Sequence, residues 1–134
     1  MAKIGYEIWL IRAQSNLQLA KTGKKKHIVY EDLCFEAQQS AEKALKALLI
    51  YFRGNFPKVH SFNVLLNHLQ KHVGIPKYIQ DVLELSDYAV QARYPGDYFP
   101  VTKEEYKKAV RISQKVLFWV KKTIKEDQKY FRNL

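Results

Sequence analysis

The segment from residue 29 to residue 53 carries the strongest helical pattern in the chain. It contains no Gly or Pro, and residues of high helix propensity dominate its middle. Its apolar positions recur at helical spacing and form one stripe: Tyr30, Cys34, Ala37, Ala41, Leu45, Leu48 and Phe52. Because the central members of this stripe are small, a neighbouring helix can approach closely there. That neighbour could belong to the chain's own core or to a second subunit.

The apolar pattern also predicts a helix before this segment and another at the end of the chain. The first covers residues 3–22, in which Ile4, Ile8, Ile11 and Leu19, with Trp9 and Ala13 alongside, fall roughly at helical spacing. The last runs from about residue 102 to about 127 and opens with a capping box, in which Thr102 is followed by Glu105. Its inner side is expected to consist of Ala109, Ile112, Val116, Trp119, Val120 and Ile124.

Two shorter helices are predicted between the long ones. Ser61 can cap a helix that ends before Gly74, and Pro76 suits the first turn of a helix that runs to about Ala92. The apolar residues of that second short helix are Ile79, Val82, Leu83, Tyr88 and Ala89. No segment alternates like a strand. The sequence therefore predicts an all-α fold, an antiparallel up-and-down bundle of about five helices with two long central ones. It forms a single domain, 1–134, with its core at about 4–125.

Composition and charge indicate which kinds of partner the protein binds and in which cellular setting it functions. The net charge is +10 at pH 7, which favours polyanions or an acidic protein partner, although lysines also coat ordinary solvated helix faces. A lone cysteine, Cys34, permits no disulfide within the chain and fits a reducing, cytoplasmic setting. The longest apolar run, ALLIYF at 47–52, is far below the roughly 20 residues that a membrane span needs. We therefore expect no membrane association.

The sequence holds no familiar metal or cofactor motif. Only His68 and His72 are four residues apart on a predicted helix, and no third ligand accompanies them, so we expect no metal site. The glycines are scattered singly, so no phosphate-binding loop is present and no cofactor is expected. Cys34 lies on the inner stripe of the long helix, where it acts as a small core residue rather than a nucleophile.

One polar passage interrupts the helical pattern. In ARYPGDYFPVT, residues 92–102, Arg93 stands beside Tyr94 and Tyr98 in a segment rich in Pro and Gly. An Arg can bind a phosphate with its planar fork while an aromatic ring stacks on a base. Alternatively, Arg93 pairs with a nearby carboxylate, and the candidates are Glu84, Asp87 and Asp97. Further polar groups lie on the long helix and before the third helix: Gln38, Gln39, Glu42, Lys43, Lys46 and His60.

Several segments together resemble the HEPN family of small prokaryotic proteins. These are a Trp in the first helix, then LCFEAQQSAEKALKALL, HSF and DYAVQARYP, followed by a capped last helix. The resemblance covers residues 4–125. It implies a helical bundle that forms homodimers and has a cleft for nucleotide or RNA. It also implies a partner, a small nucleotidyltransferase, in a toxin–antitoxin-like system. In the ribonuclease branch of that family, an Arg followed a few residues later by a His cleaves RNA.

This chain departs from the ribonuclease pattern. No His follows Arg93, and Tyr98 occupies a position where the His could stand. Tyrosine is a poor general base near neutral pH because its pKa is about 10. His60 and Asp97 are weak substitutes, so a binding role is favoured over a catalytic one. The residues expected to bind nucleotide or RNA are Arg93, Tyr94, Tyr98, Lys43, Lys46 and His60. The alternatives are a metal-independent ribonuclease toxin and a non-catalytic dimeric adaptor.

Overall fold

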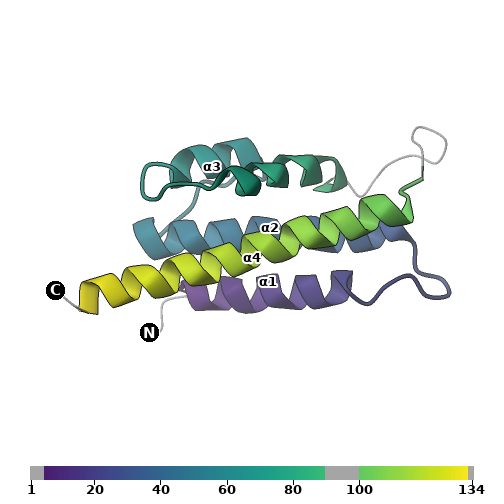
Figure 1. The fold of residues 1–134 in the computed structure, drawn as a ribbon, viewed down its shortest axis with the longest axis horizontal. Helices are drawn as coiled ribbons and strands as arrows, with labels where there is room; N and C mark the ends of the chain where they lie inside the picture. The colour runs from purple at the N-terminus through teal and green to yellow at the C-terminus, as the bar shows by residue number, and fades with distance from the viewer. Residues whose placement is uncertain (1–4, 90–99, 133–134) are drawn as a thin grey trace.

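The computed structural model describes residues 5–89 and 100–132, and every described element is helical (Figure 1). Along the chain the elements are α1 (Tyr6–Ala20), α2 (Tyr30–Arg53), α3 (Phe62–Leu69), η1 (Lys77–Ala89) and α4 (Lys103–Arg132). The long helices α2 and α4 form the body of an up-and-down bundle, as the apolar pattern predicts. Among the described residues, no helix combines the length and apolarity that crossing a bilayer requires.

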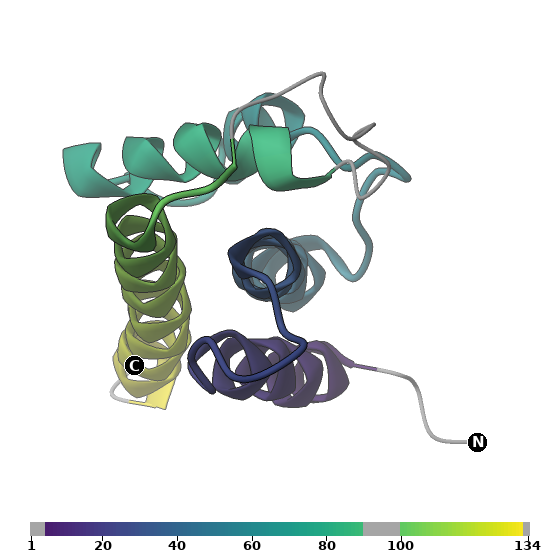
Figure 2. The ribbon, with the colours of Figure 1, turned by 90° about the vertical axis from the view of Figure 1, so that its right-hand side faces the viewer.

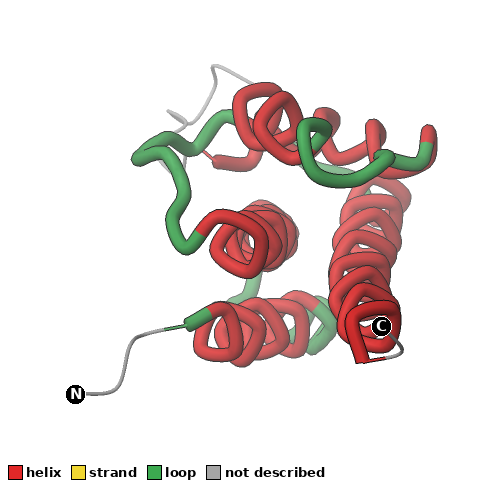
Figure 3. The backbone as a smooth tube through the Cα atoms, turned by 90° about the vertical axis from the view of Figure 1, so that its left-hand side faces the viewer, coloured by secondary structure: helices red, strands yellow, loops and turns green. Residues whose placement is uncertain are grey.

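Helix α2 is the centre of the bundle. Seen end-on, it is surrounded by α1, by α4 and by the layer made of α3 and η1 (Figures 2 and 3). The segment 54–61 passes the remaining side of α2, across from α4. A helix enclosed in this way buries residues around its circumference, which explains why polar as well as apolar side chains of α2 lie inside.

Small residues fill the contact between α1 and α2. Ala13 and Ala20 of α1 are fully buried, as are Ala37, Ala41 and Ala44 of α2. The Ser40 hydroxyl, on the same helix, donates a 2.8 Å hydrogen bond to the carbonyl of Ala13, which shows how closely the backbones approach. The small-residue stripe predicted on the long helix therefore belongs to the chain's own core and not to a subunit interface.

Of the apolar residues that indicated the first helix, Ala13 is fully buried, but most of the others do not face the core. Ile8, Ile11 and Leu19 are about half exposed or more, at 47, 64 and 50 per cent. Ile4 lies outside the described residues. The side that α1 turns to the core consists of Tyr6, Leu10, Ala13, Leu17 and Ala20. Two apolar stripes run along α1, and the one with alanines packs inward because it matches the small residues of α2.

The element η1 is a 3₁₀ helix, whereas the sequence pattern predicted an ordinary helical segment to about Ala92. A 3₁₀ helix has three residues per turn, so side chains three apart line up. Ile79, Val82 and Leu85 follow this repeat and are buried. Leu83, which an α-helical register places inside, is only partly buried. Runs of this length are uncommon because 3₁₀ hydrogen bonds have poorer geometry.

The predicted caps are confirmed. Ser61 accepts a hydrogen bond from the backbone N–H of Val64 at the start of α3. Thr102 and Glu105 exchange the two bonds of a capping box at the start of α4. Gly54 ends α2 with a φ of 81°, a conformation that favours glycine. The predicted inner residues of α4 are all buried, although the helix continues to Arg132 rather than ending near 127.

Candidate functional site

A row of polar side chains on α2 is buried inside the bundle. Gln38, Glu42 and Lys46 are four residues apart, so they share one side of the helix, and they are 0, 3 and 5 per cent exposed. The amide of Gln38 donates to Glu42 Oε1 at 3.1 Å, and Lys46 Nζ donates to Glu42 Oε2 at 2.9 Å. Glu42 is therefore the hub of a hydrogen-bonded row, because both of its carboxylate oxygens accept bonds from neighbours one turn away.

His60 joins this row from another part of the chain. Its Nδ1 lies 2.9 Å from Glu42 Oε2, while 79 per cent of its side chain is exposed. An ionised carboxylate can only accept hydrogen bonds, so Nδ1 carries a hydrogen and donates it. The other ring nitrogen, Nε2, has no hydrogen-bond partner among the described residues. A buried carboxylate thus fixes an exposed imidazole in one orientation and leaves Nε2 open to solvent.

The balance of interactions keeps Glu42 ionised. Desolvation is the largest single effect and raises the pKa of Glu42. The hydrogen bonds from His60, Lys46 and Gln38, together with the Lys46 charge, outweigh it, so the pKa lies below its usual value. A buried charge normally requires such paired partners. The carboxylate can therefore hold both the Lys46 ammonium group and the His60 ring at neutral pH.

Two aromatic rings flank the Lys46 end of the row. Lys46 Nζ lies 5.0 Å from the ring centroid of Phe56 and 6.0 Å from that of Trp9. The two rings pack edge to face, with centroids 4.9 Å apart. Phe56 comes from the same 54–61 segment as His60, and Trp9 comes from α1. The chain thus gathers three separate elements around Glu42 and Lys46, and cation–π attraction adds to the ion pair.

A second polar connection links α2 to α1. Asn16 of α1 donates to Glu36 Oε2 at 2.6 Å and accepts from Lys43 Nζ at 2.7 Å. Desolvation lowers the pKa of Lys43, and the positive charge of Arg12 lowers it further. Lys43 is only partly buried, so its ammonium group remains within reach of solvent. Arg12 and Lys43 are thus two cations close enough to repel each other.

The structure places the predicted binding residues unevenly. Lys43 and His60 lie on the partly exposed side of the network, whereas Lys46 is buried and its charge is matched by Glu42. Arg93, Tyr94, Asp97 and Tyr98 lie outside the described residues. Of the acids named as partners of Arg93, Glu84 forms an ion pair with Lys108 at 2.7 Å.

The sequence pattern identified Gln38 and Glu42 as polar groups but did not show that Glu42 is the hub of the row. The signal was present, because positions 38, 42 and 46 repeat every four residues, beside the apolar stripe of the same helix. Asn16 and Phe56 were missed altogether. No local pattern marks them, since both act through contacts with residues distant in the chain.

Two other histidines, His68 and His72, and the cysteine pack against neighbouring side chains. His68 Nδ1 lies 2.7 Å from the Arg53 guanidinium, and the His72 ring stacks on Phe52. Within residues 5–89 and 100–132, no group of three or more His, Cys, Asp or Glu side chains could hold a metal ion. Burial, with the charges of Glu105 and Glu31 adding to it, raises the pKa of Cys34 to about 12, which makes this thiol a poor nucleophile.

Comparisons with known proteins agree on the nature of the chain. A family model described as HEPN domain matches residues 6–123. The crystal structure of TT1696 from Thermus thermophilus is similar, with 33% identity and a TM-score of 0.75 over 87% of this chain and 96% of that one. The crystal structure of ST0689, an archaeal HEPN homologue, has 29% identity and a TM-score of 0.71 over 91% of this chain and 99% of that one. A search of curated proteins gives no match.

Proposed function

Because the chain belongs to the HEPN family, we propose that it binds a nucleotide or RNA at the face where α2 meets the 54–61 segment. The observation that supports this most is the exposed His60 ring, held by the buried carboxylate of Glu42. A ring fixed in advance loses little entropy when it meets a ligand. The net charge of the chain, +10, favours a phosphate-bearing ligand over a neutral one.

Each residue has a distinct part in this proposal. The Lys43 ammonium group donates to phosphate oxygens, and His60 Nε2 accepts a hydrogen bond from a sugar hydroxyl. Lys46 acts indirectly by keeping Glu42 in place. Arg93 contributes a second phosphate contact, and Tyr94 or Tyr98 stacks on the base. Those last roles rest on the sequence, on residue types suited to phosphate and base recognition.

Titration with nucleotides and short RNAs tests the proposal. Binding should weaken as salt rises, because phosphate contacts release counterions. Arg93→Ala should reduce affinity about tenfold, the loss typical of a charge-assisted hydrogen bond. Arg132→Ala, which removes an exposed Arg at the end of α4, is the matched control and should have no effect. If ATP and RNA bind both variants equally, or bind neither variant nor the parent, the proposal fails.

A metal-independent ribonuclease is the second candidate, and the His60 geometry favours it. With Nδ1 bonded to Glu42, a neutral His60 presents Nε2 as an acceptor that can take a proton from a ribose 2′-hydroxyl. Purified protein should then cleave RNA in the presence of a chelator, and His60→Asn should abolish the cleavage. Intact RNA after long incubation would exclude this activity.

We further propose two partners on the basis of the family. One is a small nucleotidyltransferase, in a toxin–antitoxin-like arrangement; a short reading frame that encodes such an enzyme beside the gene is the expected finding.

The other proposed partner is a second copy of the chain. The apolar stripe of Ile8, Ile11 and Leu19 on the outer side of α1 supports self-association, because water-exposed apolar stripes mark interaction surfaces. If the protein is instead a non-catalytic dimeric adaptor, it should assemble but bind no nucleotide or RNA, and its assembly should not change in His60 or Arg93 variants.

A further inference from the structure

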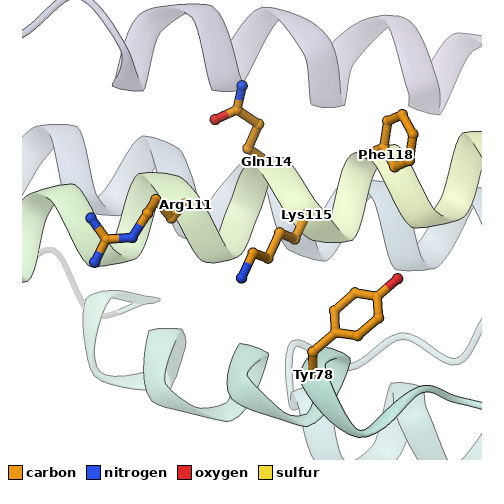
Figure 4. A pocket seen from close by; sticks show the side chains of 5 residues that line it. All are labelled: Tyr78, Arg111, Gln114, Lys115 and Phe118. Carbon is orange, nitrogen blue, oxygen red and sulfur yellow. The ribbon is translucent and has the colours of Figure 1, made fainter.

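A hollow on the other side of the molecule has no part in the nucleotide or RNA proposal. It lies between η1 and α4, has a volume of about 560 Å³, and is lined by Tyr78, Arg111, Gln114, Lys115 and Phe118. Tyr78 reaches from η1 toward α4, and Lys115 extends from α4 toward η1 (Figure 4). In the end-on views α4 lies across α2 from the 54–61 segment, so the hollow and His60 are on different sides of the bundle (Figures 2 and 3).

Two aromatic rings give the hollow its apolar character. Phe118 is 68 per cent exposed and Tyr78 is 47 per cent exposed, so neither ring is sequestered in the core. A hollow of this size accommodates a few large side chains. Exposed aromatic rings that line one hollow from two packed elements mark a place where a partner covers apolar surface. The rings therefore predict a ligand with an apolar side.

The charged residues that line this hollow, Arg111 and Lys115, are both positive. Arg111 and Lys115 are one helical turn apart on the exposed side of α4, and neither forms an ion pair with any residue in 5–89 or 100–132. Lys107 continues the same row one turn earlier. A ligand that fills the hollow therefore needs negative charge next to its apolar side.

The same groove changes sign further along η1. Side chains three apart line up on a 3₁₀ helix, so the side that begins with Tyr78 continues through Asp81, Glu84 and Asp87. Glu84 and Asp87, with Glu105 of α4, line a second hollow of about 320 Å³. The ion pair between Lys108 and Glu84, at 2.7 Å, belongs to this second hollow. A polyanion that followed this groove would run into these carboxylates, whereas a short segment with local acidic charge would not.

We propose that the Tyr78–Phe118 hollow binds an acidic amphipathic helical segment of a protein partner. Leu- or Phe-like side chains of the segment fill the hollow, and its Glu or Asp side chains pair with Arg111 and Lys115. RNA fits less well, because the groove becomes acidic beyond Lys108. A second copy of this chain also fits less well, because its net charge of +10 opposes two such basic faces meeting.

The test uses the full chain and a labelled synthetic peptide with Glu on one side of a helix and Leu and Phe on the other. Phe118→Ser should raise the Kd of the peptide about tenfold, the scale of a lost anchoring residue. The matched control is Phe131→Ser, because Phe131 is similarly exposed, at 63 per cent, near the end of the same helix. Lys115→Glu should weaken binding in the same way, while Lys125→Glu, also exposed on α4, should weaken it less.

Further arms identify the partner class. A peptide of the same composition in scrambled order should bind weakly, because its acidic and apolar residues no longer lie on separate sides. His60→Asn should leave peptide binding unchanged, which distinguishes this site from the proposed nucleotide site. Equal binding of the peptide to the Phe118 and Phe131 variants, or no binding at all, would overturn the proposal. The proposal would also be overturned if a single-stranded RNA bound the protein and Phe118→Ser weakened that binding but not the binding of the peptide.

Discussion

At the scale of single residues, the interior of this protein is organised around one carboxylate. Glu42 accepts hydrogen bonds from Gln38 and Lys46 and holds the Nδ1 side of the His60 ring. Three partners converge on a side chain that is 3 per cent exposed, so removing any one of them changes the surroundings of the others. An ion pair that would contribute only a few tenths of a kcal/mol on an exposed helix surface becomes structurally decisive inside the bundle.

Removing one partner of the Glu42–Lys46 ion pair should therefore lower the free energy of unfolding more than replacing both partners with apolar residues. Lys46→Met leaves the Glu42 carboxylate without its ammonium partner, and Glu42→Leu leaves the Lys46 charge buried alone. Each single change should lower the free energy of unfolding by about 3 kcal/mol, whereas the double variant should lose less than either. Urea unfolding of the three variants measures this. Losses that simply add in the double variant would show that the two groups do not interact.

The Glu42 carboxylate should also make the free energy of unfolding depend on pH in the acidic range. The folded-state pKa of Glu42 is lowered, so its contribution is fully present above its unfolded pKa of about 4.3 and is lost as pH falls through the folded value. The free energy of unfolding should decline below about pH 4.3, and Glu42→Gln should flatten part of that decline. Unfolding curves recorded at several acidic pH values check this. Identical slopes for parent and variant would contradict it.

At the scale of elements, the 3₁₀ helix η1 sets what lies on each side of the α4 groove. Its three-residue repeat buries Ile79, Val82 and Leu85 and brings Tyr78 into line with the acidic residues of the groove. An α-helical turn of 3.6 residues would rotate these positions apart within a few turns. The conformation of η1 therefore determines both the core contact and the character of the surface above it.

Two leucines of η1 distinguish these registers. Leu85 is 1 per cent exposed, so Leu85→Ala should lower the free energy of unfolding by about 3 kcal/mol. Leu83 is only partly buried, so Leu83→Ala should lower the free energy of unfolding clearly less. Thermal or urea unfolding of the two variants compares them. A larger loss at Leu83 than at Leu85 would show that η1 has the α-helical register in solution.

The helices could be predicted from sequence wherever one pattern dominated. The apolar stripe of α4, the long run without Gly or Pro in α2 and the caps at Ser61 and Thr102 all follow local rules that depend on residues within a turn. Helix α1 has two apolar stripes, so periodicity alone could not choose between them. The 3₁₀ conformation of η1 was likewise out of reach, because the segment has apolar residues for either repeat, Leu83 for 3.6 residues per turn and Leu85 for three.

At the scale of the whole molecule, two distinct surfaces lie on different sides of α2. One carries the fixed His60 ring and Lys43, and the other carries the Tyr78–Phe118 hollow. The residue types of the first surface could be predicted from sequence, but its hub could not. Glu42 and His60 are 18 residues apart, and only the path of the 54–61 segment brings them together. The hollow could not be predicted at all, since it depends on how η1 lies against α4.

Self-association through α1 belongs to this scale as well. Ile11 is 64 per cent exposed in a stripe with Ile8 and Leu19, so Ile11→Glu should place a charge in the proposed homodimer contact and yield monomers. Asn63→Glu, at an exposed position in the first turn of α3, is the control and should leave the assembly intact. Light scattering during size-exclusion chromatography reports the mass. A dimer that persists in the Ile11 variant would place the interface elsewhere.

Whether the face around His60 binds RNA or nucleotide is decided by comparing two histidine variants in a titration followed by fluorescence anisotropy. His60→Asn can still donate to Glu42 but lacks the Nε2 position, whereas His27→Asn changes another exposed His, at a φ of 69° that Asn tolerates. We predict that His60→Asn weakens the binding of a short RNA or of ATP about tenfold and that His27→Asn leaves it unchanged. Equal affinity of the two variants would contradict the proposed site.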